Sequence, residues 1–167
     1  MFETERLRVR RLEEADAEFL CRILTDPGFV GNIGDRGVRS AEDARGYFHQ
    51  RIETSYEEHG FGMSRVALKA GDVPIGITGL VDRKGLTDAP DVGFAFLAAH
   101  VGRGYGYEAG RGLIDWARDA MGFTRLLGIT SRTNTASAGL LGKLGFRECG
   151  ALMLPDHAEP SRLFERG

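Results

Sequence analysis

The sequence is poor in cysteine. Its two cysteines, Cys21 and Cys149, lie far apart and match no metal-ligand spacing. This scarcity argues against a zinc site, and we expect two reduced, partly buried thiols and no bound metal. An excess of charge of either sign is also lacking, because the net charge is only −2 and no basic stripe of the kind that binds nucleic acid is present. We therefore expect no nucleic-acid partner.

A secretory signal and a membrane segment are missing as well. Residues 1–10, MFETERLRVR, are charged from the third residue onward and lack the apolar region of a signal peptide. The sequence therefore predicts a cytoplasmic protein with no membrane partner. The chain has 167 residues, 42% of them hydrophobic and 28% charged, which is the length and composition of one globular domain. We predict that residues 1–167 form a single domain.

Hydrophobic periodicity predicts a mixed α/β domain with one dominant sheet, in the element order β α α β β β α β α β β. The predicted strands cover residues 6–10, 63–69, 74–81, 91–98, 125–131, 146–154 and 161–165. The predicted helices cover residues 15–24, 41–59, 107–121 and 135–143. Residues 28–39 have no period and are predicted to be a loop, and the arginines of the first strand are expected to face water.

Local signals mark the ends of these helices. Asp26 and Pro27 are expected to stop the first helix. Ser40 opens the second with a pattern that resembles a capping box, in which Asp43 takes the usual place of glutamate. Asn134 is expected to cap the last helix, which ends before Gly145.

The chain is organised around residues 91–106, DVGFAFLAAHVGRGYG. An alternating strand ends in a turn that contains Gly102, Gly104 and Gly106, and helical periodicity begins at Tyr107. Glycines allow backbone N–H groups to turn toward a ligand, and a helix N-terminus carries about half a positive charge. The junction therefore predicts an anion site for a group such as a pyrophosphate. A tight connection that binds no ligand is the alternative.

Two familiar phosphate-binding motifs fit this junction poorly. A P-loop needs Gly-Lys-Ser or Gly-Lys-Thr at the start of a helix, whereas the sequence GKL at 142–144 lies at a helix end. Residues 104–109 match the dinucleotide pattern G-x-G-x-x-A, but the next strand ends at Ser131 and Arg132 without the acidic residue that would hold an NAD ribose. The dinucleotide interpretation stays open as a minor alternative.

A third interpretation comes from a family resemblance. The segments GRGYG at 102–106, NTAS at 134–137 and LGF at 144–146 together resemble the GNAT superfamily of acyl-CoA-dependent N-acetyltransferases. The opening ETERLRVRRL, the Asn-x-x-Ser segment and the helix start at 106–109, a shortened form of Gly-Tyr-x-x-Glu-Ala, are most similar to the branch of ribosomal-protein N-terminal (Rim-type) acetyltransferases. This resemblance implies a mostly antiparallel sheet of six to seven strands, splayed in the middle and flanked by about four helices.

The family pattern of the glycine loop is Gln/Arg-x-x-Gly-x-Gly/Ala, whose amides hold the CoA pyrophosphate. Gly104 and Gly106 match its last two glycine positions, whereas Val101 replaces the leading Gln or Arg. The resemblance also implies that residues 91–98 and 125–131 splay apart, so that the strand end offers unpaired backbone groups to the pantetheine arm. The implied acetyl-CoA contacts are Phe96, Leu97, Ala98, Gly102, Arg103, Gly104, Tyr105, Gly106, Tyr107, Asn134 and Ser137, with Arg111 as a further phosphate contact.

Acetyl transfer to an amine needs a neutral amine, donors for the oxyanion and a proton for the leaving thiolate. Ser137 is the candidate general acid, since the tyrosine that many relatives carry four residues later is Leu141 here. Asp91 is the candidate base, acting through a water, and His100 is a second candidate. The structural alternatives are that Asp91 is a strand-end carboxylate, that Ser137 and Asn134 only cap a helix, and that His100 is a surface residue.

We therefore predict a monomeric or homodimeric N-acetyltransferase that uses acetyl-CoA and a primary amine acceptor. The branch resemblance favours a protein N-terminus, and small amines such as polyamines or antibiotics remain open. The rival interpretation is a regulatory module that binds acyl-CoA without turnover, which the replacements at Val101 and Leu141 keep open.

Overall fold

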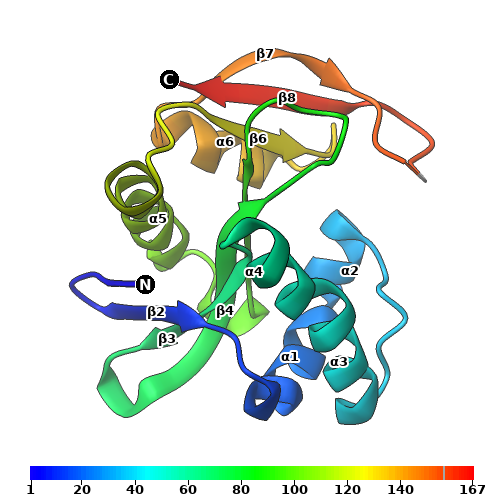
Figure 1. The fold of residues 1–167 in the computed structure, drawn as a ribbon, viewed down its shortest axis with the longest axis vertical. Helices are drawn as coiled ribbons and strands as arrows, with labels where there is room; N and C mark the ends of the chain where they lie inside the picture. The colour runs from blue at the N-terminus through cyan, green and yellow to red at the C-terminus, as the bar shows by residue number, and fades with distance from the viewer. Residues whose placement is uncertain (156) are drawn as a thin grey trace.

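The computed structural model describes residues 1–155 and 157–167. These residues form an eight-stranded sheet in the order β1-β2-β3-β4-β5-β6-β8-β7 (Figure 1). The strands are β1 (Phe2–Glu3), β2 (Leu7–Arg11), β3 (Met63–Leu68), β4 (Val73–Val81), β5 (Asp91–Phe96), β6 (Leu126–Thr130), β7 (Arg147–Leu152) and β8 (Ser161–Arg166). All neighbours pair antiparallel except β5 and β6. The predicted mixed, mostly antiparallel sheet is confirmed, and the two-residue β1 is the strand that the sequence pattern missed.

The helices agree with the predicted order and differ in number. They are α1 (Ala17–Leu24), α2 (Pro27–Ile33), α3 (Ala41–Tyr47), α4 (Thr54–His59), α5 (Tyr105–Met121) and α6 (Thr135–Lys143). The predicted helix over 41–59 is divided, because the π-helical segment Phe48–Glu53 joins α3 to α4. None of the helices in the described chain is both long and apolar enough to cross a membrane.

Helix α2 corrects the expectation of a loop over residues 28–39. Pro27 occupies the first turn of this helix, and Asp26 Oδ1 accepts a hydrogen bond from the Gly28 N–H at 2.8 Å. Proline is favoured there because its fixed φ suits a helix and its missing N–H would have had no helical partner. The Asp-Pro pair that ends α1 therefore also begins α2.

The helices cover the two faces of the sheet. Helices α1 to α4 lie on one side and α5 on the other (Figure 1). On the first side Leu20, Phe48 and Ile77 belong to one core cluster. On the second side Leu80 and Leu113 belong to another. The sheet is thus buried on both faces around β4 and β5, and β5 borders the candidate site.

The sheet opens between β5 and β6. These two strands share a single bridge, Asp91 with Leu127, and the Leu127 N–H donates to the Pro90 carbonyl at 3.0 Å. Beyond this bridge no further pairing joins the described residues of β5 and β6. In Figure 1 the layer of β6, β8 and β7 accordingly stands apart from the lower strands. The predicted splay is confirmed, and it leaves one edge of β5 without a partner strand.

Candidate active site

The open edge of β5 carries the backbone groups of alternate residues. Leu97 N–H donates to the Ile75 carbonyl at 2.9 Å, and Ala95 pairs with Ile77. In an antiparallel ladder this register turns the N–H and C=O groups of Ala95 toward β4 and those of Phe94 and Phe96 the other way. Because β6 does not pair at these positions, the groups of Phe94 and Phe96 line the gap.

Two of the three predicted strand-end residues do not offer free N–H groups, which corrects the expectation for Leu97 and Ala98. Leu97 N–H is bonded to β4, as described above. Ala98 N–H donates to Asp26 Oδ2 at 3.2 Å. Their carbonyls accept from His100 and Val101, at 2.8 and 3.3 Å. Of the predicted set, only Phe96 keeps its backbone groups toward the gap.

Asp26 is a residue that the sequence pattern recognised only as a helix stop. Its carboxylate caps α2 through Gly28 and binds the end of β5 through Ala98. The Asp-Pro pair is also a local signal for a helix start, which the prediction did not use. No local pattern indicates the bond to Ala98, which is 72 positions away. Asp26 thereby ties α2, on one face of the sheet, to the strand end beside the gap.

The glycine loop has the geometry of an anion site. Gly102 and Gly104 adopt φ values of +79° and +81°, a region that disfavours other residues. The first helical hydrogen bond of α5 runs from the Glu108 N–H to the Gly104 carbonyl at 3.1 Å. The N–H groups of Tyr105, Gly106 and Tyr107 precede it, so they have no acceptor within the helix and are available to a phosphate.

Gly106 lies in a closely packed position. Its φ is ordinary, but a Cβ at this position would lie 3.1 Å from Leu140 Cδ2 and 3.7 Å from Phe96 Cε2. The start of α5 therefore packs closely against both β5 and α6. Val101, where the family has Gln or Arg, is 65% exposed and supplies no polar side chain to the loop.

Helix α5 begins at Tyr105, two residues before the predicted start. With that start, residues 104–109 carry the Gly-Tyr-x-x-Glu-Ala pattern in full, so its description as a shortened form at 106–109 was wrong. The glutamate of the pattern is Glu108, which lies in the first turn of the helix.

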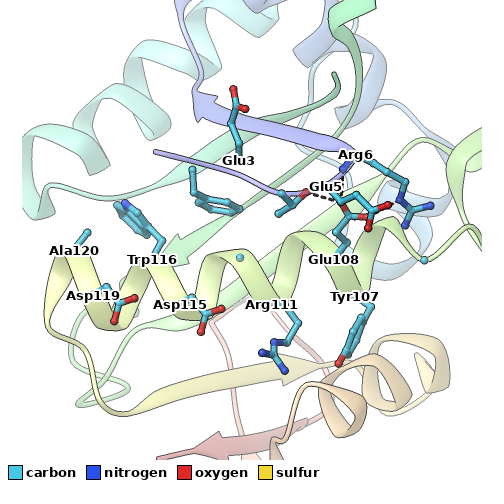
Figure 2. Close-up of a pocket in the computed structure, with 14 residues that line it drawn as sticks. Glu3, Glu5, Arg6, Tyr107, Glu108, Arg111, Asp115, Trp116, Asp119 and Ala120 are labelled. Carbon is cyan, nitrogen blue, oxygen red and sulfur yellow. Dashed lines mark hydrogen bonds and ion pairs between the residues drawn. The ribbon is translucent and has the colours of Figure 1, made fainter. Parts of the chain in front are cut away.

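Glu108 binds the N-terminal segment, as Figure 2 shows. Its Oε1 accepts from Thr4 Oγ1 at 2.5 Å and from the Arg6 N–H at 2.8 Å, and its Oε2 accepts from Arg6 Nε at 2.6 Å. Partial burial raises the pKa of Glu108, but these hydrogen bonds together outweigh it and leave the pKa lowered. The Arg6 side chain is 45% exposed, so it faces water as expected while it also binds Glu108.

Tyr107, Arg103 and Arg111 are the exposed side chains around the loop. Figure 2 shows Tyr107 and Arg111 leaving α5 on the side opposite to Glu108. Tyr107 is 42% exposed. Tyr107 and Arg111 are among the residues that line a groove of about 990 Å³ between the N-terminal segment and α5. The phosphate contacts of Arg103 and Arg111 stay predictions.

On α6, Asn134 caps the helix as predicted, since its Oδ1 accepts from the Ser137 N–H at 3.0 Å. The Ser137 hydroxyl is therefore not needed for the cap, and it has no hydrogen-bond partner among residues 1–155 and 157–167. Leu141 is 1% exposed. It packs so closely on β6 that a Cβ at Gly128 would lie 2.7 Å from its Cδ2. The Ser137 hydroxyl is thus left without a bond to the described residues, and its role as general acid stays a prediction.

Asp91 lies at the closed end of the gap, at the bridge to Leu127. It is 2% exposed, and its two oxygens accept from Arg83 Nε and Nη2 at 3.2 and 3.1 Å. Burial raises the pKa of Asp91, and Arg83 opposes this effect. A buried carboxylate held by an arginine is poorly placed to take a proton from an entering amine. This environment favours the structural alternative, and the base role stays a prediction.

His100 lies in the short helical turn Ala98–His100 that follows β5. Its ring centroid is 6.3 Å from that of Tyr105, and its Nδ1 is buried with no hydrogen-bond partner in the described part of the chain. Among the described residues, no cluster of three or more His, Cys, Asp or Glu side chains could hold a metal ion.

Comparisons with known proteins agree with this arrangement. The family described as Acetyltransferase (GNAT) domain matches residues 6–147. An uncharacterized N-acetyltransferase, p20, from Bacillus licheniformis is 28% identical over 151 residues, covering 89% of this chain and 83% of its own.

Solved structures share the fold. A ribosomal-protein-S5-alanine acetyltransferase from Vibrio fischeri superposes with a TM-score of 0.78 at 21% identity, over 99% of this chain and 94% of its own. RimL, a ribosomal L7/L12 α-N-protein acetyltransferase in complex with coenzyme A, superposes with a TM-score of 0.82 at 15% identity, over 98% of this chain and 94% of its own. The splayed sheet, the glycine loop and the family match lead to one conclusion: the chain is a member of the GNAT acetyltransferase family.

Proposed function

We propose that this enzyme transfers an acetyl group from acetyl-CoA directly to a primary amine in a ternary complex, with a protein N-terminus as the acceptor. GNAT acetyltransferases use acetyl-CoA as the acyl donor. The observation that carries the proposal is the continuity of two binding surfaces: the unpaired edge of β5 runs into a glycine loop whose helix-start N–H groups are free for a pyrophosphate.

The proposed contacts follow from this geometry. The N–H groups of Tyr105, Gly106 and Tyr107 hold the pyrophosphate, and the gap-facing backbone of Phe96 binds the pantetheine arm. A gap-facing N–H of β5 stabilises the oxyanion, because a fixed donor there needs no reorganisation during the reaction. Asn134 caps α6, the helix that carries Ser137.

Proton transfer is assigned to Ser137 and to solvent. Acetyl-CoA supplies an activated thioester, and Ser137 Oγ donates the proton that the departing thiolate needs while it takes a proton from solvent water. The amine loses its proton to water, since Asp91 is buried behind Arg83. Asp91 then acts as a structural residue at the junction of the two halves of the sheet.

The protein N-terminus as acceptor is supported by the resemblance to Rim-type enzymes. Solved structures with this fold also include a spermidine N-acetyltransferase chimera and an aminoglycoside acetyltransferase. A module that binds acyl-CoA without turnover is the second candidate. Val101 and Leu141 favour this second candidate. Val101 replaces the Gln or Arg of the family pattern and so removes a side-chain contact to the loop, and Leu141 replaces a tyrosine and so removes its hydroxyl. The cytoplasmic location and the monomeric or homodimeric state stay predictions.

One experiment separates these functions. Release of free CoA thiol is measured after mixing the enzyme and acetyl-CoA with a peptide that has a free N-terminus and no lysine, with the same peptide blocked at its N-terminus, with spermidine and with an aminoglycoside. We expect release with the unblocked peptide only. Faster release with spermidine or the aminoglycoside would reassign the acceptor. Binding of acetyl-CoA without release for any amine would support the regulatory module.

A further inference from the structure

The N-terminal segment is fastened to the glycine loop by one side chain. Arg6 Nη1 donates to the Arg103 carbonyl at 3.1 Å, in addition to the bonds that its Nε and N–H make to Glu108. Its guanidinium also lies 4.6 Å from the centroid of the Tyr105 ring. Arg6 therefore contacts the loop and the first turn of α5 at three residues, about a hundred positions along the chain.

The loop needs such a contact. Gly102 and Gly104 have positive φ values, and glycine loses more conformational freedom on ordering than any other residue. The Arg103 carbonyl between them is held by Arg6, which orders the segment before a ligand arrives. A loop that is already ordered binds its ligand more tightly, because the binding free energy is not used to order the loop.

Arg6 also balances a charge at the proposed anion site. Glu108 is an anion in the first turn of α5, close to the N–H groups that are proposed to bind the pyrophosphate. Without Arg6 its negative charge would repel that group. The ion pair, with Arg6 Nε at 2.6 Å from Glu108 Oε2, neutralises it.

We propose that Arg6 is a positioning residue for the pyrophosphate loop: through the Arg103 carbonyl and Glu108 it holds the loop in the form that binds the pyrophosphate of the acyl donor. This inference rests on the proposed function. Arg6 acts here through other residues and is not a catalytic group.

The test compares two donors in three proteins. Values of kcat/KM are measured with acetyl-CoA and with S-acetylpantetheine, which lacks the pyrophosphate, for the wild type, Arg6→Ala and Arg8→Ala. Arg8 is the matched control, because it lies on β2 and pairs with Glu3 and Asp72 instead of the loop. We expect Arg6→Ala to lower kcat/KM for acetyl-CoA about tenfold, as for a lost charge-assisted hydrogen bond, and to change the value for S-acetylpantetheine less than twofold. Arg8→Ala should change neither.

Binding of CoA, measured by calorimetry, gives a readout that does not depend on turnover. Arg6→Ala should raise the dissociation constant about tenfold, and adding Glu108→Gln should recover part of the loss, because the unpaired negative charge is then gone. If Arg6→Ala does not fold, Arg6→Lys carries the test with an expected loss of about threefold, since lysine keeps the charge and loses the forked geometry.

Two results would overturn the inference: equal losses for both donors, or a dissociation constant unchanged by Arg6→Ala and Arg6→Lys. A wild-type protein that fails to bind CoA at all would instead refute the proposed function, so the two failures are distinguishable.

Discussion

The buried carboxylate of Asp91 pairs with the partly exposed guanidinium of Arg83 at the point where the two halves of the sheet meet. The carboxylate accepts two hydrogen bonds from the guanidinium, at 3.2 and 3.1 Å, and the side chain of Arg83 is 31% exposed. The adjacent Asp91–Leu127 bridge joins β5 to β6. The pair therefore lies beside the bridge at which the gap begins.

The first prediction concerns the effect of Asp91→Asn on stability. Burial raises the pKa of Asp91 above its ordinary value of 3.8, so the folded protein binds this proton more tightly than the unfolded chain does. Stability from this group is then fully present at low pH and is lost as pH rises from about 4 through the folded pKa. Chemical denaturation at several pH values should show wild-type stability falling relative to Asp91→Asn over this interval. A relative gain over the same interval would contradict the direction of the shift.

The same variant tests the base role in catalysis. A structural pair predicts a fall in kcat/KM of less than about tenfold that is the same at every pH. A catalytic base predicts a large defect below the pKa of the amine that shrinks at high pH, where neutral amine is abundant. Recovery at high pH would restore Asp91 as the base.

A second prediction separates strain from binding at the glycine loop. Gly104→Val should cost about 1–3 kcal/mol of stability, because valine does not readily adopt a φ of +81°. Gly122→Val is the matched control, since Gly122 has a φ of +75° at the opposite end of α5. Thermal unfolding should show similar losses for both variants, whereas only Gly104→Val should weaken CoA binding in calorimetry. Equal CoA affinities for the two variants would remove the loop from the site.

The third prediction addresses the general acid. Ser137→Ala should lower kcat by about 10²–10⁴-fold, the range for a positioned acid, with CoA affinity almost unchanged. Thr135→Ala, in the same turn of α6, is the control and should keep its activity. Measurement across pH should show that the Ser137→Ala defect persists at high pH. A fall of only a few-fold would mean that water protonates the thiolate.

Local patterns in the sequence were sufficient for much of the site. The alternation of residues 91–96, the three glycines that follow and the Asn134 cap each depend on neighbours within a few positions, so β5, the loop and α6 were predicted almost to their observed limits. The same local reasoning missed α2, because the Asp-Pro pair serves both as a stop and as a start.

Only the tertiary structure decided which groups these elements bring together. Arg6 reaches Glu108 across 102 positions, and Asp26 reaches Ala98 across 72. Asp91 was predicted to be a base that acts through a water, but its side chain is buried and bonded to Arg83 beside the bridge to β6. A short-range sequence pattern predicts which helices and strands form. The burial of a side chain and the charges beside it depend on distant segments, which meet only when the sheet is assembled.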